Sequence, residues 1–289
     1  MCTGGDIDNF RRYSAKSVMP LGAHPFYHEV KGVFVVLKRK SIIFAAVFLF
    51  AAVLLAAACG VSGAAGVFFG VPSRKIPVYC VERGEDEEKV IALTFDAAWG
   101  ADKTRGIMDI LEEYDAGGTF FLVGFWLDKY PDMTREIAER GFEMGNHSAN
   151  HLNMPKLNDE TMRAEISSVN ARIEQLAGVK PKFFRAPYGD YSDRLMTAVE
   201  GEGMVGVQWS IDTLDWKGLS AAEITERVVP KAKSGDIVLF HNNSDHVLDA
   251  LPLVLMGLKN KGLRFVGLSE LVATEGFTVD HTGMQHKDA

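Results

Sequence analysis

From Ile76 onward, the chain alternates short apolar runs with longer amphipathic runs, and this alternation restricts the fold more than any other feature. Seven runs have the length and composition of buried strands: Val90–Phe95, Gly118–Val123, Phe142–Gly145, Phe183–Arg185, Val205–Ser210, Ile237–Phe240 and Leu263–Val266. The runs between them predict helices: Thr104–Tyr114, Asp128–Glu139, Asp159–Ala177, Asp193–Gly201, Ala221–Lys233 and Val247–Lys261. Strands that alternate with helices form parallel sheets. Seven such repeats in roughly 200 residues predict an α/β fold, a distorted (β/α)7 TIM-like barrel over residues 76–275.

The two ends of the chain lie outside this pattern. The last residues are polar, so we predict that residues 276–289 form a frayed polar tail in which His281 and His286 are solvated. Residues 1–40 show no clear periodicity and no motif, and they are assigned no fold. A natural start inside this segment, later than Met1, is an alternative.

A long uncharged segment separates the N-terminal part from the main domain. Residues 41–71 contain no charged side chain, and Lys38-Arg39-Lys40 precedes them directly. A helix that spans a bilayer needs about 20 mostly apolar residues, which this segment supplies. Because flanking cations stay on the cytoplasmic side, we expect a single-pass protein of the cell membrane with an extracytoplasmic main domain. A cleaved signal peptide is the alternative, and the small residues Ala56-Ala57-Ala58 would suit its cleavage site.

The formal charge is divided unevenly along the chain. Residues 1–71 carry seven Lys or Arg and three Asp or Glu, a charge of +4, whereas the remainder carries 24 and 35, a charge of −11. An acidic main domain argues against nucleic acid as a partner, because such binding needs clustered cations. The three cysteines, Cys2, Cys59 and Cys80, are too scattered to support a thiolate zinc site or a disulfide framework.

Two of the eight histidines, His147 and His151, lie four residues apart just after the predicted strand Phe142–Gly145. If the chain enters a helix there, both imidazoles share one face and can bind one metal ion. Imidazole suits zinc, cobalt, nickel or iron, and two such ligands leave positions open for water and substrate. An isolated pair with this spacing is more often a pair of surface histidines, so the interpretation depends on the rest of the chain.

Polar side chains also recur at the carboxyl ends of other predicted strands, where barrel enzymes carry their catalytic groups. Asp96 could act as a general base, although a loop aspartate is the commoner explanation of such a residue. Arg185 could hold a carboxylate in its ionised form, and a structural ion pair explains it equally well. Further strand ends carry Asp212, Asp215, Trp216 and His241. Structural roles alone explain five such strand ends poorly.

The order of these residues resembles the five motifs of the polysaccharide deacetylases, the NodB-homology group or carbohydrate esterase family four. The matching segments are Thr94-Phe95-Asp96, His147-Ser148-x-x-His151, Arg185-x-Pro187-Tyr188-Gly189, Asp212-x-x-Asp215-Trp216 and Leu239-x-His241. The resemblance extends from Ile76 to Ala273, which is nearly all of the main domain. The short first motif, followed by Trp-Gly, is most similar to that of membrane-anchored sporulation-type deacetylases.

This resemblance implies a hydrolase that acts on carbon–nitrogen bonds other than peptide bonds. Such an enzyme removes N-acetyl groups from N-acetylglucosamine or N-acetylmuramic acid in a cell-wall glycan such as peptidoglycan. The resemblance implies that His147 and His151 bind a divalent metal, which would be zinc, cobalt or nickel. It further implies that Asp96 takes a proton from the attacking water and that His241 protonates the leaving amine.

The same resemblance assigns supporting roles to other residues. Arg185 would hold the base, and Asp212 would orient and tune the acid. Tyr188, Trp216 and Pro187 would contact the sugar, and the backbone amide of Tyr188 would stabilise the oxyanion.

One position departs from the family pattern. The family usually carries a second aspartate directly after Asp96 as the third metal ligand, and this chain has Ala97 there. Zinc sites of this type rely on three protein ligands, so we expect the metal to be weakly bound. The metal could bind with an extra water, Asp96 could become a ligand, or the site could be empty. The alternative function is therefore a catalytically disarmed glycan-binding or scaffold protein.

Overall fold

The computed structural model describes residues 74–288 of the 289-residue chain. The predicted anchor at residues 41–71 and the segment 1–40 lie outside these residues. Within residues 74–288, no helix combines the length and the apolar character that crossing a bilayer requires.

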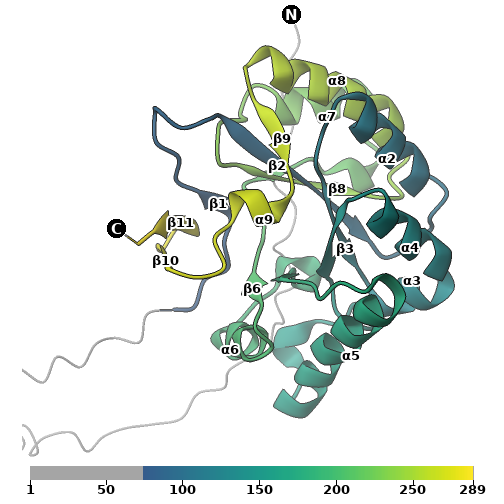
Figure 1. The fold of residues 1–289 in the computed structure, drawn as a ribbon, viewed down its shortest axis with the longest axis vertical. Helices are drawn as coiled ribbons and strands as arrows, with labels where there is room; N and C mark the ends of the chain where they lie inside the picture. Colours follow the sequence, from purple (N-terminus) through teal and green to yellow (C-terminus); the bar gives the residue numbers. More distant parts are fainter. Residues whose placement is uncertain (1–73, 289) are drawn as a thin grey trace, which may run out of the picture. The chain divides into compact units, whose positions relative to one another are not determined.

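A curled sheet of parallel strands forms the centre of the described domain (Figure 1). The strand order is β6-β5-β4-β3-β2-β8-β7, and β9 pairs with the first part of β2. The strands are β2 Val90–Ala97, β3 Thr119–Leu122, β4 Glu143–Asn146, β5 Phe183–Phe184, β6 Val205–Gly206, β7 Ile211–Asp212, β8 Ile237–His241 and β9 Arg264–Val266. The α/β class and the parallel sheet are confirmed, and the strands form a curled half-barrel of seven strands.

The predicted strand Val205–Ser210 is wrong in its bounds, because this run changes partners along its length. Its first part, β6, pairs with β5, whereas β7 pairs with β8 on the other side of the sheet. Between β6 and β7, the backbone N–H of Gln208 donates to the backbone oxygen of Val78. The segment before β2 therefore occupies the space between these two strands. The two edges of the half-barrel therefore belong to one irregular run of chain.

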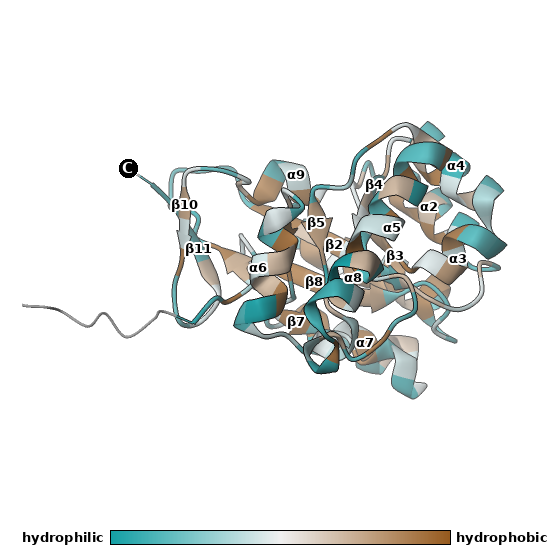
Figure 2. Ribbon diagram, turned by 90° about the horizontal axis from the view of Figure 1, so that it is seen from below, coloured by the Kyte–Doolittle hydropathy of each residue, from teal (hydrophilic) through white to brown (hydrophobic). Residues whose placement is uncertain are grey.

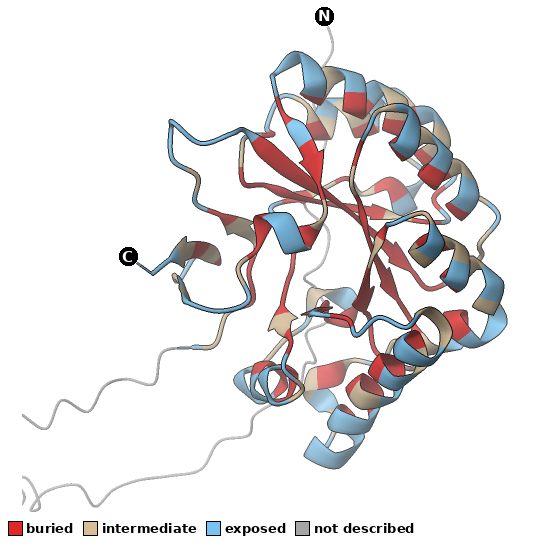
Figure 3. Ribbon diagram, in the orientation of Figure 1, coloured by how far each residue is buried: buried red, intermediate tan, exposed pale blue. Residues whose placement is uncertain are grey.

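Helices cover the outer face of the sheet, and their apolar sides are buried against it (Figures 2 and 3). The helices are α2 Thr104–Glu113, α3 Gly124–Lys129, α4 Pro131–Glu139, α5 Asp159–Ala177, α6 Asp193–Gly201, α7 Ala221–Val228, α8 Val247–Asn260 and α9 Leu268–Leu271. Phe95 on β2 stacks between Phe120 on β3 and Phe240 on β8, with ring centroids 5.1 and 5.5 Å away. Because side chains alternate along a strand, this packing directs Thr94 and Asp96 to the opposite, inner face.

One predicted helix is divided in two and another ends earlier than the apolar pattern suggested, and proline explains both. The predicted helix Asp128–Glu139 is divided into α3 and α4, because Tyr130 precedes Pro131 and leaves the helical conformation at φ −129°. The predicted helix Ala221–Lys233 ends at Val228, since Pro230 has no N–H group to continue the ladder.

The prediction of a frayed tail at residues 276–289 is wrong. Strands β10 Phe277–Val279 and β11 Met284–Lys287 form a hairpin, and β11 pairs in parallel with β1 Cys80–Val81. Gln285 is fully buried and exchanges two hydrogen bonds with the backbone of Ala273. His286 contacts Glu82 and Asp280, so it is partly buried and ion-paired. The domain therefore extends beyond the predicted boundary at residue 275.

Candidate active site

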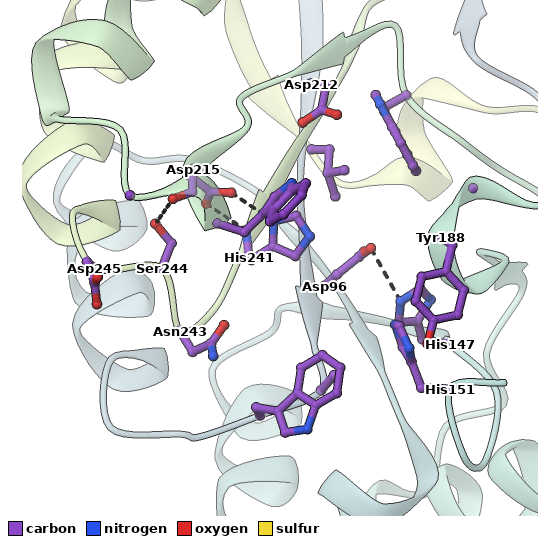
Figure 4. Close-up of a pocket in the computed structure, with 17 residues that line it drawn as sticks. Asp96, His147, His151, Tyr188, Asp212, Asp215, His241, Asn243, Ser244 and Asp245 are labelled. Carbon is purple, nitrogen blue, oxygen red and sulfur yellow. Dashed lines mark hydrogen bonds and ion pairs between the residues drawn. The ribbon is translucent and has the colours of Figure 1, made fainter. Parts of the chain in front are cut away.

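A pocket of about 640 Å³ opens at the carboxyl ends of the parallel strands (Figure 4). Asp96 is the residue before the last of β2 and His241 ends β8, and the two residues are paired in register across these strands. His147 and His151 follow β4 and approach from the other side of Asp96 (Figure 4). The strand-end residues singled out in the sequence therefore meet at one site, as expected for this architecture.

Asp96 is buried between a guanidinium and an imidazole. Its Oδ1 accepts a hydrogen bond from Nη1 of Arg185 at 2.8 Å, and its Oδ2 lies 3.4 Å from Nε2 of His147. Burial by itself would raise the pKa of Asp96, but the neighbouring His147 and Arg185 outweigh it and hold the pKa below its ordinary value. The carboxylate is therefore ionised at neutral pH and can accept a proton.

Arg185 makes the expected contact with Asp96, and further contacts hold its side chain in place. Its side chain is fully buried, and Nη2 donates to Thr94 Oγ1 and to the backbone oxygen of Gln208. The Phe121 ring lies 4.1 Å from the guanidinium carbon. These contacts leave Arg185 one orientation, and this orientation fixes Asp96 at the pocket floor.

The two histidines converge through a loop, so the expected helix after β4 is wrong. Ser148 and His151 adopt left-handed backbone conformations at φ 65° and 52°. The turn is closed by hydrogen bonds from Ser148 N to Asn146 Oδ1 and from His151 N to Ser148 Oγ. The two imidazole centroids lie 5.0 Å apart, so the loop achieves the proximity that a helix face was expected to give.

Both imidazoles are in the neutral form that binds metals. His147 donates from Nδ1 to the backbone oxygen of Arg185 at 2.8 Å, which leaves Nε2 without a proton on the side of Asp96. Burial lowers the pKa of His147, and burial beside the His147 ring lowers the pKa of His151 to about 4. Nδ1 of His151 is buried and has no hydrogen-bond partner among the described residues.

These observations fit a divalent metal held by the two histidines, because a buried, unpartnered imidazole nitrogen needs a ligand. Within residues 74–288, no group of three or more His, Cys, Asp and Glu side chains is arranged to hold an ion. Ala97 is fully buried in the apolar core with Val123 and Trp126, while Asp96 and Ala98 on either side line the pocket. In the part of the chain that the structure describes, the carboxylate next to the histidines is therefore the candidate base itself, with Asp96 Oδ2 3.4 Å from His147 Nε2.

The carboxylate that orients the candidate acid is Asp215, so the expectation that Asp212 orients His241 is wrong, although the charge of Asp212 does help to raise the pKa of His241. Asp215 Oδ1 lies 2.8 Å from Nδ1 of His241, and its Oδ2 accepts the backbone N–H of His241. The chain turns at Leu214, where φ is 52°, and the following turn Asp215–Lys217 buries the Asp215 carboxylate below His241. Asp212 lines the pocket, and its Oδ1 accepts the backbone N–H of Leu214.

The environment of His241 favours the protonated imidazole. Burial alone would lower the pKa of His241, but the hydrogen bond to Asp215 and the charges of Asp96 and Asp215 raise it above its ordinary value. The carboxylate on Nδ1 also leaves Nε2 as the nitrogen available to a substrate. His241 is thus suited to donate a proton, and its raised pKa extends the pH range over which it can do so.

Exposed aromatic rings border the pocket. Tyr188 and Trp216 are 67% and 59% exposed and line it, as expected for groups that contact a ligand. Pro187 is buried and is not among the residues that line the pocket, so its assignment to substrate contact is wrong. It begins the turn Pro187–Gly189 that presents Tyr188 at φ 63°. Trp99, 58% exposed, lines the pocket as well, although the sequence reasoning gave it no role.

A sequence profile described as polysaccharide deacetylase matches residues 83–207. A peptidoglycan-N-acetylglucosamine deacetylase of Bacillus cereus is 37% identical over 188 residues, which cover 64% of this chain and 68% of that protein. The peptidoglycan-N-acetylmuramic acid deacetylase PdaC of Bacillus subtilis is 31% identical and is covered over 40% of its length, with 66% of this chain aligned.

Solved structures of two kinds are similar to this chain. The Bc1960 peptidoglycan N-acetylglucosamine deacetylase is 34% identical at a TM-score of 0.63, with 68% of this chain and 94% of that chain covered. Wild-type BA3943 from Bacillus anthracis, described as a CE4 family pseudoenzyme, is 30% identical at a TM-score of 0.65, with 68% and 69% covered. A BA3943 mutant described as having restored enzymatic activity is 32% identical at a TM-score of 0.64, with 68% and 71% covered.

Proposed function

The chain belongs to the polysaccharide deacetylase family, and from this premise we propose that it hydrolyses N-acetyl groups in a cell-wall glycan. The sugar unit is N-acetylglucosamine or N-acetylmuramic acid, and peptidoglycan is the glycan that the named relatives act on. One observation carries the proposal: Asp96 and His241 are paired in register on neighbouring strands and line one open pocket, and their surroundings lower the pKa of the carboxylate and raise the pKa of the imidazole. Amide hydrolysis needs such a base and such an acid.

The base acts first in this scheme. Asp96 takes a proton from a water molecule as that water attacks the acetamide carbon. Arg185 keeps the carboxylate in place through the 2.8 Å hydrogen bond, and its charge keeps the pKa of Asp96 low enough for the base to be ready at neutral pH. The backbone amide of Tyr188 is the proposed donor to the oxyanion.

The acid completes the reaction. His241 donates the proton from Nε2 to the leaving amine nitrogen, so that the carbon–nitrogen bond breaks and acetate and a free amine result. Asp215 stabilises the protonated imidazole before this step and sets its orientation throughout. Tyr188 and Trp216 offer their exposed faces to the sugar ring.

His147 and His151 are the residues that would hold a divalent metal, for which we propose zinc, cobalt or nickel. When bound, such an ion polarises the acetamide carbonyl and lowers the pKa of water. His147 is prepared for this by its Nδ1 hydrogen bond, which fixes the tautomer, and His151 by its buried and unpartnered Nδ1. With Ala97 in the core, the protein supplies two imidazoles, and the metal is held weakly.

Metal binding is expected to stabilise the full-length protein against heat. At a zinc concentration one hundred times the Kd, the free energy of unfolding rises by about 2.7 kcal/mol. A His151→Ala variant loses this stabilisation, whereas His281→Ala, a change at an exposed histidine, keeps it. Differential scanning calorimetry with zinc, cobalt and nickel measures the effect. A wild-type Tm that no metal raises, or an equal rise in His151→Ala, contradicts this metal site.

A second candidate function is a catalytically disarmed protein that binds glycan without deacetylating it. Ala97 favours this alternative, because the residue replaces the usual third ligand, and so does the similarity to a structure described as a pseudoenzyme. This candidate predicts glycan binding that survives both chelation and His147→Ala, with no acetate released by the wild type. Measuring acetate release beside glycan binding separates the two candidates.

We further propose that residues 41–71 attach the protein to the cell membrane as a single-pass anchor and place the catalytic domain outside the cytoplasm. The uncharged segment behind Lys38-Arg39-Lys40 supports this placement, and the wall glycan that the relatives' names mention would be within reach there. A role in sporulation is proposed on the subgroup resemblance of the first motif. If protease added to intact cells leaves the domain uncut, the placement is wrong.

A further inference from the structure

Trp99 belongs to a row of aromatic rings that continues beyond the catalytic residues. The centroid of the Trp99 ring lies 5.2 Å from that of His151 and 6.1 Å from that of Phe125. The His151 ring lies 4.7 Å from that of Tyr188. We call Phe125, Trp99, His151 and Tyr188 the aromatic row. It leads from the pocket to an exposed ledge formed by Trp99 and Phe125, which are 58% and 36% exposed.

Hydrogen bonds from buried side chains fix the loop that carries Trp99. Gly100, which follows Trp99, has a φ of 66°, and its carbonyl oxygen accepts hydrogen bonds from Trp126 Nε1 and Asn242 Nδ2 at 2.6 and 2.9 Å. Trp126 and Asn242 are both fully buried. The exposed indole is thus attached to a fixed loop, and a ligand that stacks on it meets a preorganised surface.

The exposed aromatic ledge has the chemical character of a surface that binds a sugar ring. A contiguous apolar surface beside a pocket that contains catalytic groups indicates a binding site, unlike scattered exposed apolar side chains. A pyranose ring presents apolar C–H groups on its faces and hydroxyls at its edge, so a flat aromatic surface fits one of its faces. The catalytic groups take the acetamide of one sugar, and Trp99 lies next to them without contributing a proton donor or acceptor to the reaction.

We propose that Trp99, with Phe125 beside it, binds a sugar unit adjacent to the one that is deacetylated. The substrate class is then a glycan chain of at least two sugars, and a single N-acetylated sugar lacks half of the binding surface. This inference rests on the proposed function, because it takes the bound molecule to be an N-acetylated glycan. Trp99 is accordingly a specificity-determining residue, and its removal affects long substrates much more than short ones.

Calorimetric titration with the N-acetylglucosamine tetrasaccharide and with the N-acetylglucosamine monosaccharide tests the proposal. The full-length protein is used in an Asp96→Asn background, which prevents turnover during the titration. Trp99→Ala is expected to weaken tetrasaccharide binding about fivefold to tenfold and to weaken monosaccharide binding much less, so that the ratio of the two affinities falls. Trp99→Phe restores most of the affinity for the tetrasaccharide. Met256→Ala on α8, which removes a side chain that is 48% exposed, is the matched control and has no effect.

The outcomes distinguish this inference from the proposed function. Three results would each overturn the proposal. The tetrasaccharide could bind equally well with and without Trp99, both sugars could lose the same affinity because His151 is disturbed, or the parent protein could fail to bind the tetrasaccharide. Acetate release is measured separately on chains with Asp96 intact. If the wild type releases none while Trp99→Ala still loses tetrasaccharide affinity, the deacetylase function fails and the binding ledge stands.

Discussion

The Asp96→Asn variant is expected to release acetate about 10²–10⁴ times more slowly than the wild type, because a general base contributes a factor of this size. The amide oxygen of the new side chain still accepts the hydrogen bond from Arg185, but it cannot take a proton from water. Initial rates on an N-acetylglucosamine oligomer measure the loss. Asp102→Asn is the matched control, since Asp102 is exposed, lies in the loop that follows β2 and is not among the residues that line the pocket.

The folded state of the Asp96→Asn variant has to be verified in the same experiment. Replacing the carboxylate leaves the buried guanidinium of Arg185 without a counter-charge, which destabilises proteins by about 3–5 kcal/mol when a buried pair is broken. The Tm therefore falls, and rates are compared below the unfolding transition. A folded Asp96→Asn variant that retains a third or more of the wild-type rate would show that Asp96 is not the base.

Asp215→Asn is expected to lower kcat by about 10²–10⁴-fold, whereas Asp212→Asn lowers it by less than about tenfold. Both changes remove one carboxylate, and the two residues are only three positions apart, at the end of β7 and in the turn that follows it. Only Asp215 contacts the imidazole of His241, through Nδ1 at 2.8 Å and through the backbone N–H. Asp212 faces the pocket from β7 and accepts the N–H of Leu214. Comparison of kcat for the two variants decides which aspartate supports the acid.

The pH dependence of kcat/KM is a second measurement that distinguishes the Asp215→Asn and Asp212→Asn variants. His241 acts as an acid only while it is protonated, so a raised pKa extends the activity towards higher pH. Removing Asp215 takes away the hydrogen bond and a charge that raise this pKa, so the alkaline limb of kcat/KM shifts to lower pH. Asp212→Asn leaves that limb nearly in place. A larger shift in Asp212→Asn than in Asp215→Asn would restore the original assignment of Asp212.

The convergence of the site could be predicted from sequence because parallel strands end at one edge of the sheet. Asp96, Arg185 and His241 each follow an apolar run that became β2, β5 or β8, so their meeting follows from the alternation of strands and helices. The five ordered motifs added the identity of the chemistry. Both kinds of signal depend on chain order alone, which explains why they survive errors in the bounds of single elements.

What the sequence could not supply was the path of the backbone inside short loops. Asp212 and Asp215 are both carboxylates beside Trp216, and the left-handed conformation of Leu214 decides which one reaches His241. Non-glycine residues rarely adopt this conformation, so residue type gives no warning of it. The same holds for the loop of the two histidines, where Ser148 and His151 have positive φ. The sequence predicted that the two imidazoles would lie close together, but a loop and not a helix brings them together.

The C-terminal hairpin was missed because its strands are short and polar. Its turn has a recognisable signal, since Asp280 accepts hydrogen bonds from the N–H groups of Thr282 and Met284, and Gly283 has a φ of 86°. The buried Gln285 gives no apolar pattern, and its hydrogen bonds to Ala273 form only in the folded domain. Tertiary contacts, which composition does not reveal, determine this part of the fold.

The measurement that tests the central claim most directly is acetate release by the full-length protein from peptidoglycan and from N-acetylglucosamine oligomers. It is made as isolated, after chelation, and again with zinc, cobalt or nickel restored. Acetate release is expected to fall on chelation and to return with at least one metal, which would establish a metal-dependent deacetylase with Ala97 in place of the usual third ligand. No release from either substrate with any metal, in a protein that still binds the glycan, would contradict this expectation and leave the disarmed glycan-binding protein.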